Sequence, residues 1–147
     1  MNSNIPLFLG SDHAGFPLKE YLCAQLKNAG YSFQDFGTFD LDSVDYPDFV
    51  HPVMEAIRNS PNGRGILICG SGQGVCMTAN KYPFIRAALV WNPEIAKLSR
   101  QHNDSNVLCL PGRFISTQDA WDSFLNFIQT PFEGGRHLNR IQKMNTK

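Results

Sequence analysis

Short apolar runs alternate with longer amphipathic segments along the whole chain. The run Gly-Ile-Leu-Ile-Cys at residues 65–69 is continuously apolar, as is typical of a strand buried on both faces of a parallel sheet. Pro17 suits the first turn of a helix and Gly30 suits the position just after its end. We therefore predict strands over residues 6–10, 31–36, 65–69, 85–91 and 106–110. Helices are predicted over residues 17–29, 47–59, 75–80, 93–101, 116–129 and 135–144.

The order of these elements predicts the fold class. Strands that alternate with helices through short breaks favour an α/β fold, in which helices cover both faces of a five-stranded parallel sheet to give three αβα layers. Two further helices follow the last strand and close the chain. The chain has 147 residues and no internal repeat, linker or low-complexity tract, so we expect a single domain over residues 1–147.

Composition narrows the classes of function. Thirteen basic residues balance thirteen acidic ones, which argues against nucleic-acid binding because that function needs a clustered positive excess. The first residues lack the pattern of a signal peptide, and no apolar run approaches the roughly 20 residues of a membrane-spanning helix. The four cysteines have neither C-x-x-C nor zinc-ligand spacing. We expect a cytoplasmic protein with free thiols and no membrane association.

Candidate chemistry gathers where the predicted strands end. In parallel sheets, ligands bind at the carboxyl ends of the strands, where the chain turns into loops. Three of the four loops at this edge carry residue types that a packed core does not require. The four loops are Gly10-Ser-Asp12-His13, Cys69-Gly-Ser-Gly-Gln-Gly74, Trp91-Asn92 and Pro111-Gly-Arg113.

The loop over residues 70–74, Gly-Ser-Gly-Gln-Gly, follows a buried strand and opens a helix. Glycine lets the backbone approach a ligand closely, and free N–H groups at the start of a helix attract anions. The loop does not fit a dinucleotide fingerprint, because Val75 stands in place of the third glycine, and no Gly-Lys-Ser/Thr of a P-loop follows. It is not a hydrolase nucleophile elbow either, because that motif has a glycine two residues before its serine, whereas Cys69 stands two residues before Ser71. We interpret this loop as a cradle for an oxyanion or a polyol.

Cys69 is the last strand residue before that cradle. A thiol close to the start of a helix can supply a thiolate, which is a good base. A buried structural cysteine explains the same position equally well, and it explains Cys23, Cys76 and Cys109 better. Position alone therefore leaves both interpretations of Cys69 open.

Histidines and arginines add further candidates. His13 follows the first strand and His102 lies near the end of a helix, positions that favour a functional role over a structural one. Arg136 and Arg140 are four residues apart, so a helix would place both guanidinium groups on one face, where a phosphate would relieve their repulsion. A solvated helix end explains this pair equally well. Arg113, beside a strand end, is a third phosphate candidate.

Seven short motifs, in order along the chain, resemble those of the type B ribose-5-phosphate isomerases. That family is shared with galactose-6-phosphate and allose-6-phosphate isomerases. The resemblance covers essentially the whole chain. Its motifs are GSDHAG at residues 10–15, DYP at 45–47, ILICGSG at 66–72, ANK at 79–81, IRA at 85–87, SRQHND at 99–104 and EGGRH at 133–137.

The resemblance implies a Rossmann-like fold without metal or cofactor, and a homodimer or dimer of dimers whose active sites are shared across the interface. It implies that Cys69 moves a proton between sugar carbons C1 and C2 and that His102 assists ring opening. Ser71 keeps the hydroxyl of a threonine found in many members, which makes it a catalytic candidate. The residues implied to hold sugar hydroxyls are Asp12, His13, Gly70, Gly72, Gln73, Gly74 and Asn103. Those implied to bind phosphate are Arg113, Arg136 and Arg140.

The family divides into two branches by the base, which is either this cysteine or a Glu immediately after the loop. Val75 occupies the place of that Glu, so the cysteine branch is indicated. We expect interconversion of ribose 5-phosphate and ribulose 5-phosphate through an enediolate, with loop N–H groups stabilising the oxyanion. Two alternatives stay open. One is a galactose or allose 6-phosphate substrate, and the other is a non-catalytic phosphosugar-binding protein.

Overall fold

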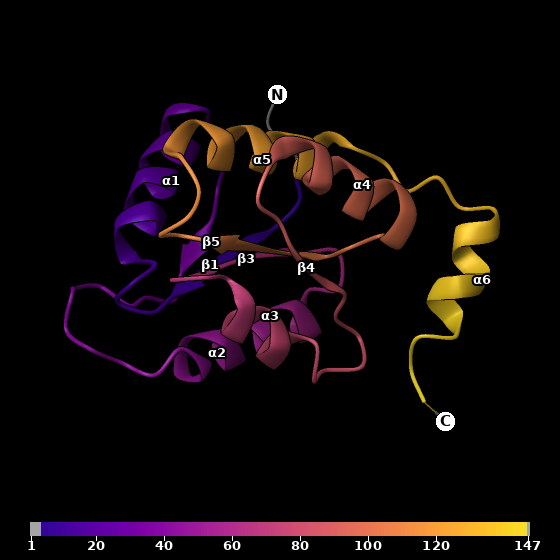
Figure 1. The fold of residues 1–147 in the computed structure, drawn as a ribbon, viewed down its shortest axis with the longest axis horizontal. Helices are drawn as coiled ribbons and strands as arrows, with labels where there is room; N and C mark the ends of the chain where they lie inside the picture. The colour runs from indigo at the N-terminus through magenta and orange to yellow at the C-terminus, as the bar shows by residue number, and fades with distance from the viewer. Residues whose placement is uncertain (1–3, 147) are drawn as a thin grey trace.

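A parallel sheet lies between two layers of helices in the computed structural model, which describes residues 4–146 (Figure 1). The sheet has five strands in the order β2-β1-β3-β5-β4, and each neighbouring pair is parallel. The strands are β1 (Leu7–Ser11), β2 (Gln34–Asp35), β3 (Arg64–Cys69), β4 (Ala87–Leu89) and β5 (Val107–Pro111). The predicted α/β fold with three αβα layers is confirmed.

The helices cover both faces of this sheet. They are α1 (Phe16–Asn28), α2 (Pro47–Asn59), α3 (Gln73–Ala79), α4 (Pro93–Asn103), α5 (Thr117–Gln129) and α6 (Arg136–Gln142). Helices α1, α4 and α5 lie on one face and α2 and α3 on the other, while α6 stands to the side beyond α4 (Figure 1). The side chains of Asn92 and Ser116 cap α4 and α5 by accepting N–H groups three residues on, each at 3.0 Å. Among the described residues, no helix is long and apolar enough to cross a membrane.

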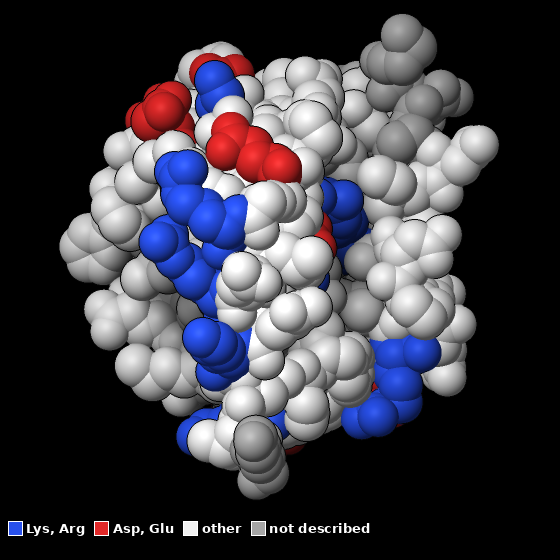
Figure 2. Space-filling view, turned by 90° about the vertical axis from the view of Figure 1, so that its right-hand side faces the viewer, with Lys and Arg blue, Asp and Glu red and all other residues white. Residues whose placement is uncertain are grey.

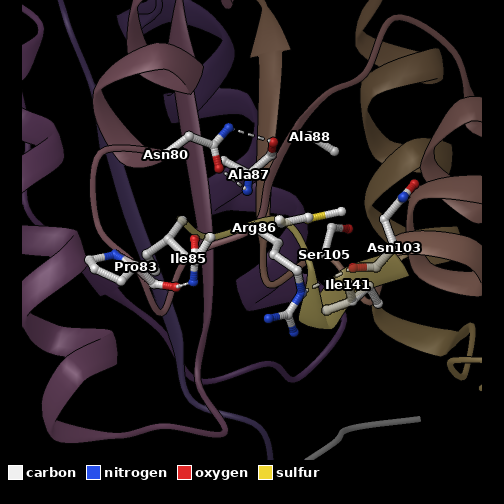
Figure 3. A pocket seen from close by; sticks show the side chains of 11 residues that line it. Asn80, Pro83, Ile85, Arg86, Ala87, Ala88, Asn103, Ser105 and Ile141 are labelled. Atoms are coloured by element: carbon white, nitrogen blue, oxygen red, sulfur yellow. Dashed lines mark hydrogen bonds between the residues drawn. The ribbon is translucent and has the colours of Figure 1, made fainter. Parts of the chain in front are cut away.

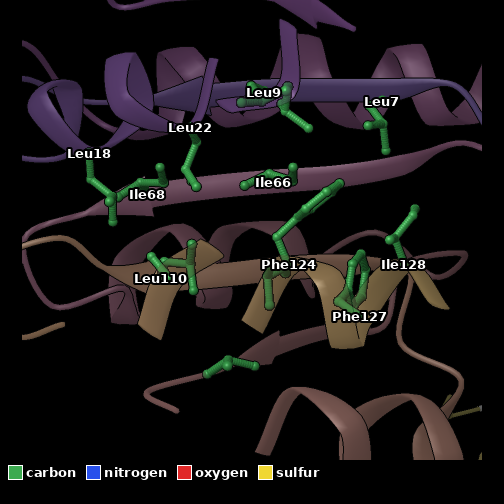
Figure 4. Packing of buried hydrophobic residues seen from close by; sticks show 14 of the residues in the cluster. Leu7, Leu9, Leu18, Leu22, Ile66, Ile68, Leu110, Phe124, Phe127 and Ile128 are labelled. Atoms are coloured by element: carbon green, nitrogen blue, oxygen red, sulfur yellow. The ribbon is translucent and has the colours of Figure 1, made fainter. Parts of the chain in front are cut away.

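Apolar clusters fill both spaces between sheet and helices. Because successive strand residues point to opposite faces, β3 sends Ile66 and Ile68 into one cluster and Leu67 and Cys69 into the other. In the first cluster the strand residues pack against α1 and α5 (Figure 4). In the second they pack against α2 and α3. The side chain of Cys69 therefore lies on the α2–α3 side of the sheet.

The two edge strands are shorter than predicted. β2 covers two residues instead of 31–36, and β4 covers three instead of 85–91. Tyr31, predicted within a strand, is buried against Phe124, with the ring centroids 5.3 Å apart. An edge strand pairs with one neighbour only, so apolar residues beside it can serve core packing in place of pairing. The prediction for residues 31–33 was wrong for this reason. Beyond the ends of β4, Val90 still donates its N–H to the carbonyl of Cys109, and the carbonyl of Arg86 accepts the N–H of Asn106, so pairing continues there by single bonds.

A fully buried lysine links α1 to the edge strand β2. The Nζ atom of Lys19 lies 2.7 Å from Asp35 Oδ2 and 3.4 Å from Glu20 Oε1. It also lies 5.2 Å from the centre of the Phe39 ring. Asp35 Oδ1 accepts the N–H of Gly37 at 2.8 Å. This ion pair therefore fixes the start of the loop over residues 36–46 as well as the strand.

The connections of the sheet diverge between β1 and β3. The chain leaves β1 for β2 on one side and then crosses to β3 on the other side. In open parallel sheets such a divergence forms a crevice at the carboxyl ends of the two strands, where ligands bind. Asp12 and His13 follow β1 directly, and Cys69 is the last residue of β3. The topology thus places these three predicted residues beside one crevice.

Candidate active site

A hollow of about 440 Å³ opens at the carboxyl edge of the sheet, and we call it the catalytic-edge hollow. Residues after β1, β3 and β5 line it together with residues of the loop before α2. Seven of its lining residues were predicted from the sequence: Asp12, His13, Cys69, Gly70, Ser71, Gly74 and Arg113. Ala14, Tyr46 and Phe114 complete the lining. The fold therefore brings four segments that are far apart in sequence into one site.

Cys69 is the cysteine that lines this hollow, and its side chain is almost buried at 5% exposure. The other thiols lie elsewhere and differ in their protonation. Burial, reinforced by the charge of Asp35, raises the pKa of Cys23 to about 11. Complete burial likewise raises the pKa of Cys109. Both thiols are therefore protonated near neutral pH, and neither lines the hollow.

The glycine loop has its conformation fixed by its neighbours. Gly72 has φ = 75°, a left-handed conformation that favours glycine, and a Cβ there would lie 2.6 Å from Leu89 Cδ1. A Cβ on Gly74 would lie 2.5 Å from Cζ of Tyr46, so the glycine allows the tyrosine ring to pack against the loop. Ser71 Oγ accepts the N–H of Gln73 at 3.4 Å. These contacts explain why small residues alternate along the loop that carries the predicted oxyanion donors.

Asp12 and His13 are each held by a backbone hydrogen bond. Asp12 is 7% exposed, and its Oδ1 accepts the N–H of Gly15 at 2.9 Å. His13 Nδ1 accepts the N–H of Val44 at 3.2 Å. Because Nδ1 accepts, the hydrogen of a neutral His13 ring must sit on Nε2. His13 therefore presents a donor, and Asp12 an acceptor, at the end of β1.

The loop after β5 brings a positive charge to the same hollow. Gly112 donates its N–H to the carbonyl of Cys69 at 2.8 Å, and Arg113 donates its N–H to the carbonyl of Gly70 at 3.0 Å. These two bonds dock the Pro-Gly-Arg loop onto the start of the glycine loop. The Arg113 side chain runs alongside Gly70, where a Cβ would be 3.5 Å from Nη1. A guanidinium thus lies within the hollow that also contains the thiol.

The other predicted residues do not line the catalytic-edge hollow. α4 runs antiparallel to the strands, so its last turn, with His102 and Asn103, lies at the amino edge, where β5 begins. Arg136 and Arg140 lie on α6 and are exposed. Gln73 lines a neighbouring slot at the catalytic edge with Ser71, Trp91 and Phe114. One chain therefore does not bring His102, Asn103 or the α6 arginines to Cys69.

Helix α6 is tethered at both ends but stands off the sheet. Glu133 donates its N–H to the carbonyl of Gln101 at 3.1 Å, and Asn145 Nδ2 donates to the carbonyl of Pro83 at 2.8 Å. Between these tethers a hollow of about 470 Å³ separates α6 from β4, with Asn103 and Ile141 in its lining (Figure 3). Lys and Arg side chains gather in a band on the side of the molecule where α6 lies (Figure 2). This side therefore presents positive charge to solvent.

Two residues without predicted roles accompany His102. Its ring stacks on that of His137, and Glu133 Oε1 lies 3.6 Å from His137 Nε2 and 4.0 Å from His102 Nε2. Burial, with the charges of His102 and Arg136, lowers the pKa of His137 and favours its neutral form. The three side chains place one ligand atom each within 4.8 Å, as metal ligands can. Both new residues belong to the EGGRH motif, which was the signal available for them.

Comparison with known proteins identifies the family to which this site belongs. The family model described as Ribose/Galactose Isomerase matches residues 7–144. The chain therefore belongs to the ribose/galactose isomerase family, as the sequence motifs predicted. The chain is 43% identical over 145 residues to the probable ribose-5-phosphate isomerase B of Mycoplasma pneumoniae, covering 98% of this chain and 95% of the relative. It is 39% identical over 139 residues to ribose-5-phosphate isomerase B of Escherichia coli, covering 90% and 89%.

Solved structures agree with this family. The fold matches a ribose 5-phosphate isomerase from Thermotoga maritima with a TM-score of 0.93 and 43% identity, covering 96% of this chain and 97% of the other. It also matches ribose-5-phosphate isomerase B from Mycoplasma genitalium with bound ribulose-5-phosphate, with a TM-score of 0.91 and 42% identity. That match covers 96% of this chain and 94% of the other. The predicted Rossmann-like architecture is thus shared with isomerases of known structure.

Proposed function

We propose that this chain interconverts ribose 5-phosphate and ribulose 5-phosphate, acting as a single domain in the cytoplasm. The observation that carries the proposal is the placement of a thiol, a guanidinium, an acceptor and a donor around one hollow, through Cys69, Arg113, Asp12 and His13. A phosphorylated sugar needs all four kinds of group. The names of the relatives support this substrate, as does the structure described with bound ribulose-5-phosphate.

The proposed reaction moves one proton from C2 to C1 and one from the C2 oxygen to the C1 oxygen within the open-chain sugar. Cys69, as thiolate, removes the proton from C2 of the aldose, and the C2–H electrons form the C1–C2 double bond of an enediolate. The carbonyl oxygen on C1 takes the negative charge. The N–H groups of the loop over residues 70–74 and the Ser71 hydroxyl stabilise it, and the loss of one such donor costs about 3 kcal/mol. A proton next passes from the C2 hydroxyl to the C1 oxygen, which leaves the negative charge on the C2 oxygen. The C2–O electrons then form the ketone carbonyl while C1 takes the proton back from the Cys69 thiol, which gives the ketose and regenerates the thiolate.

We further propose that a second copy of the chain completes the site. Sugar phosphates are mostly cyclic, so the reaction needs an acid or base for ring opening, and His102 lies at the other edge of its own sheet. A homodimer, or a dimer of dimers, would supply His102, Asn103 and the α6 arginines of one chain to the catalytic-edge hollow of the other. Phe114 at 75% exposure and Trp91 at 54% border this edge, and such large exposed apolar residues are typical of an interface.

The first experiment is turnover of ribose 5-phosphate by wild type, Cys69→Ala and a matched Cys76→Ala variant. We expect no isomerisation with Cys69→Ala, near-normal turnover with Cys76→Ala, and retained binding of ribose 5-phosphate by calorimetry. An active Cys69→Ala variant would show that another group is the base.

Two further measurements decide between the alternatives. Exchange of the C2 proton in deuterated water distinguishes an isomerase from a non-catalytic phosphosugar-binding protein, which would bind without exchange. Side-by-side turnover of ribose 5-phosphate, galactose 6-phosphate and allose 6-phosphate tests the pentose assignment. A higher kcat/KM for either hexose phosphate would overturn it.

A further inference from the structure

Three arginines converge in a second cleft, at the amino edge of the sheet and opposite to Cys69. This amino-edge cleft has a volume of about 230 Å³ and is lined by Arg64, Arg86 and Arg100, with Asp104 between them. Arg64 opens β3, Arg86 directly precedes β4, and Arg100 lies in the last turn of α4. Three separate elements thus direct guanidinium groups to one place that the proposed reaction does not use.

A single carboxylate serves two of these arginines. Asp104 Oδ1 accepts from Arg100 Nη1 at 2.9 Å, and its Oδ2 accepts from Arg86 Nη2 at 3.1 Å. Arg86 Nε also donates to the carbonyl of Asn103 at 3.0 Å (Figure 3). The same Nε donates to the carbonyl of Asp104, also at 3.0 Å. Arg100 is almost fully buried, and its Nε donates to the carbonyl of Thr130 at 3.2 Å. Both carboxylate oxygens of Asp104 therefore already accept hydrogen bonds, one from Arg86 and one from Arg100.

Arg64 has no carboxylate within ion-pair distance among residues 4–146. The one hydrogen bond of its side chain within that part of the chain runs from Nη1 to the carbonyl of Phe127 at 3.3 Å. Burial, followed by the repulsion of Arg100, lowers the pKa of Arg64 to about 10. A half-buried guanidinium that faces a like charge is stabilised by any anion that reaches it.

The charges of the cleft do not cancel. Three guanidinium groups face one carboxylate and the carboxyl ends of α4 and α5, and each helix end contributes roughly half a negative charge. About one positive charge is left. Within the described chain, Nη1 of Arg86, Nη2 of Arg100, and both Nε and Nη2 of Arg64 donate to no protein acceptor. Forked guanidinium donors around a small cleft match the geometry of a tetrahedral oxyanion.

We propose that the amino-edge cleft binds an oxyanion of the phosphate class, either inorganic phosphate or the phosphate group of a phosphorylated metabolite. This site is separate from the catalytic-edge hollow and does not depend on the proposed isomerase activity. It adjoins the end of α4, because Asp104 directly follows Asn103 and His102. An anion bound in the cleft would therefore contact the same arginines as Asp104, the residue that ends α4.

Calorimetric titration with inorganic phosphate, at an ionic strength held constant with chloride, tests the proposal. We expect wild type to bind phosphate at two sites in each chain, one in the cleft and one at Arg113. Arg64→Gln should remove the first site and Arg113→Gln the second, each with at least a tenfold loss of affinity at its own site. Arg58→Gln, which removes an equal charge from the surface of α2, should bind as wild type. Unchanged phosphate binding by Arg64→Gln would overturn the proposal.

Two further arms keep the test decisive. Titration of Arg113→Gln with ribose 5-phosphate, which presents a phosphate monoester, shows whether the cleft accepts a phosphorylated metabolite or the free ion alone. If Arg64→Gln does not fold, crystals of wild type soaked in tungstate replace it, because tungstate is a tetrahedral oxyanion that anomalous scattering can locate. We expect the ion beside Arg64 and Arg100. An empty cleft in a crystal whose catalytic-edge hollow holds tungstate would contradict the proposal.

Discussion

The imidazole rings of His102 and His137 stack with their centroids 4.5 Å apart and their planes 13° from parallel. Two rings in this arrangement repel each other when both are protonated. His137 is the more buried of the two, and its lowered pKa keeps it neutral. The stack therefore places the buried, neutral ring of His137 against the more exposed ring of His102.

The first prediction concerns stability in mild acid. Because the pKa of His137 in the folded protein is below its ordinary value of 6.5, the unfolded chain binds the proton more readily. Above about pH 6.5 the ring is neutral in both states, and the free energy of unfolding is at its full value. As the pH falls from there through the folded-state pKa, the unfolded chain takes up the proton first and this free energy decreases. His137→Gln should therefore lose less stability than wild type between about pH 7.5 and 5.5, as measured by urea unfolding. Equal losses would show that another group controls acid stability.

The second prediction concerns complementation between two inactive variants. Cys69→Ala and His102→Asn should each be inactive alone, because each destroys every shared site of a homodimer. After mixing and subunit exchange, half of the dimers are hybrids, and each hybrid has one site with both native residues. The mixture should regain about a quarter of wild-type turnover. Two copies of Cys69→Ala with different affinity tags serve as the control. Failure to regain activity, with hybrids verified by tag capture, would place both residues in one chain's site.

The third prediction concerns the buried ion pair between Lys19 and Asp35. Asp35→Asn keeps the acceptor for Gly37 but leaves the buried ammonium without its nearest counter-charge, which should cost about 3 kcal/mol of unfolding free energy. Adding Lys19→Met removes the stranded charge, so the double variant should be more stable than Asp35→Asn. Chemical denaturation measures Asp35→Asn, Lys19→Met and the double variant against wild type. Additive losses would show that the two charges do not interact.

The fourth prediction concerns cysteine reactivity. At about pH 8, iodoacetamide should leave Cys23 and Cys109 largely unmodified, because burial holds both thiols in the protonated form. Ribose 5-phosphate should slow the modification of Cys69 and leave the rate at Cys76 unchanged. Peptide mass spectrometry resolves the four sites. Protection of Cys76 alone would contradict the placement of substrate in the catalytic-edge hollow.

The fifth prediction concerns the α6 arginines. Arg136→Ala should raise KM for ribose 5-phosphate by about tenfold or more, because a charge-assisted hydrogen bond contributes roughly 1.5–3 kcal/mol. Lys143→Ala, which removes an exposed charge just after the same helix, is the matched control and should leave KM nearly unchanged. A KM for Arg136→Ala within twofold of wild type would remove this residue from the phosphate site.

The central strand and the loops at its end were predictable because they obey local rules. The apolar run at residues 65–69 has no helical alternative of that length, and the observed β3 differs from it by one residue. The edge strands were less predictable. Tyr31, for example, is buried because its ring packs against Phe124 of α5, and it does not pair within the sheet. Tyr46 and Phe114 escaped prediction because they reach the hollow from loops whose paths depend on tertiary contacts. The position of His102 at the end of α4 was predictable from the sequence. Its separation from Cys69, at the opposite edge of the sheet, became clear only from the folded structure.

The placement of Cys69 and His102 at opposite edges of one sheet has a consequence for regulation by abundance. Under the proposed two-copy site, an isolated chain carries no complete catalytic set. By mass action, the concentration of dimers at high dilution grows as the square of the concentration of chains. Activity per milligram would then fall on dilution and recover on concentration. In this regime, doubling the amount of the protein would raise the rate about fourfold.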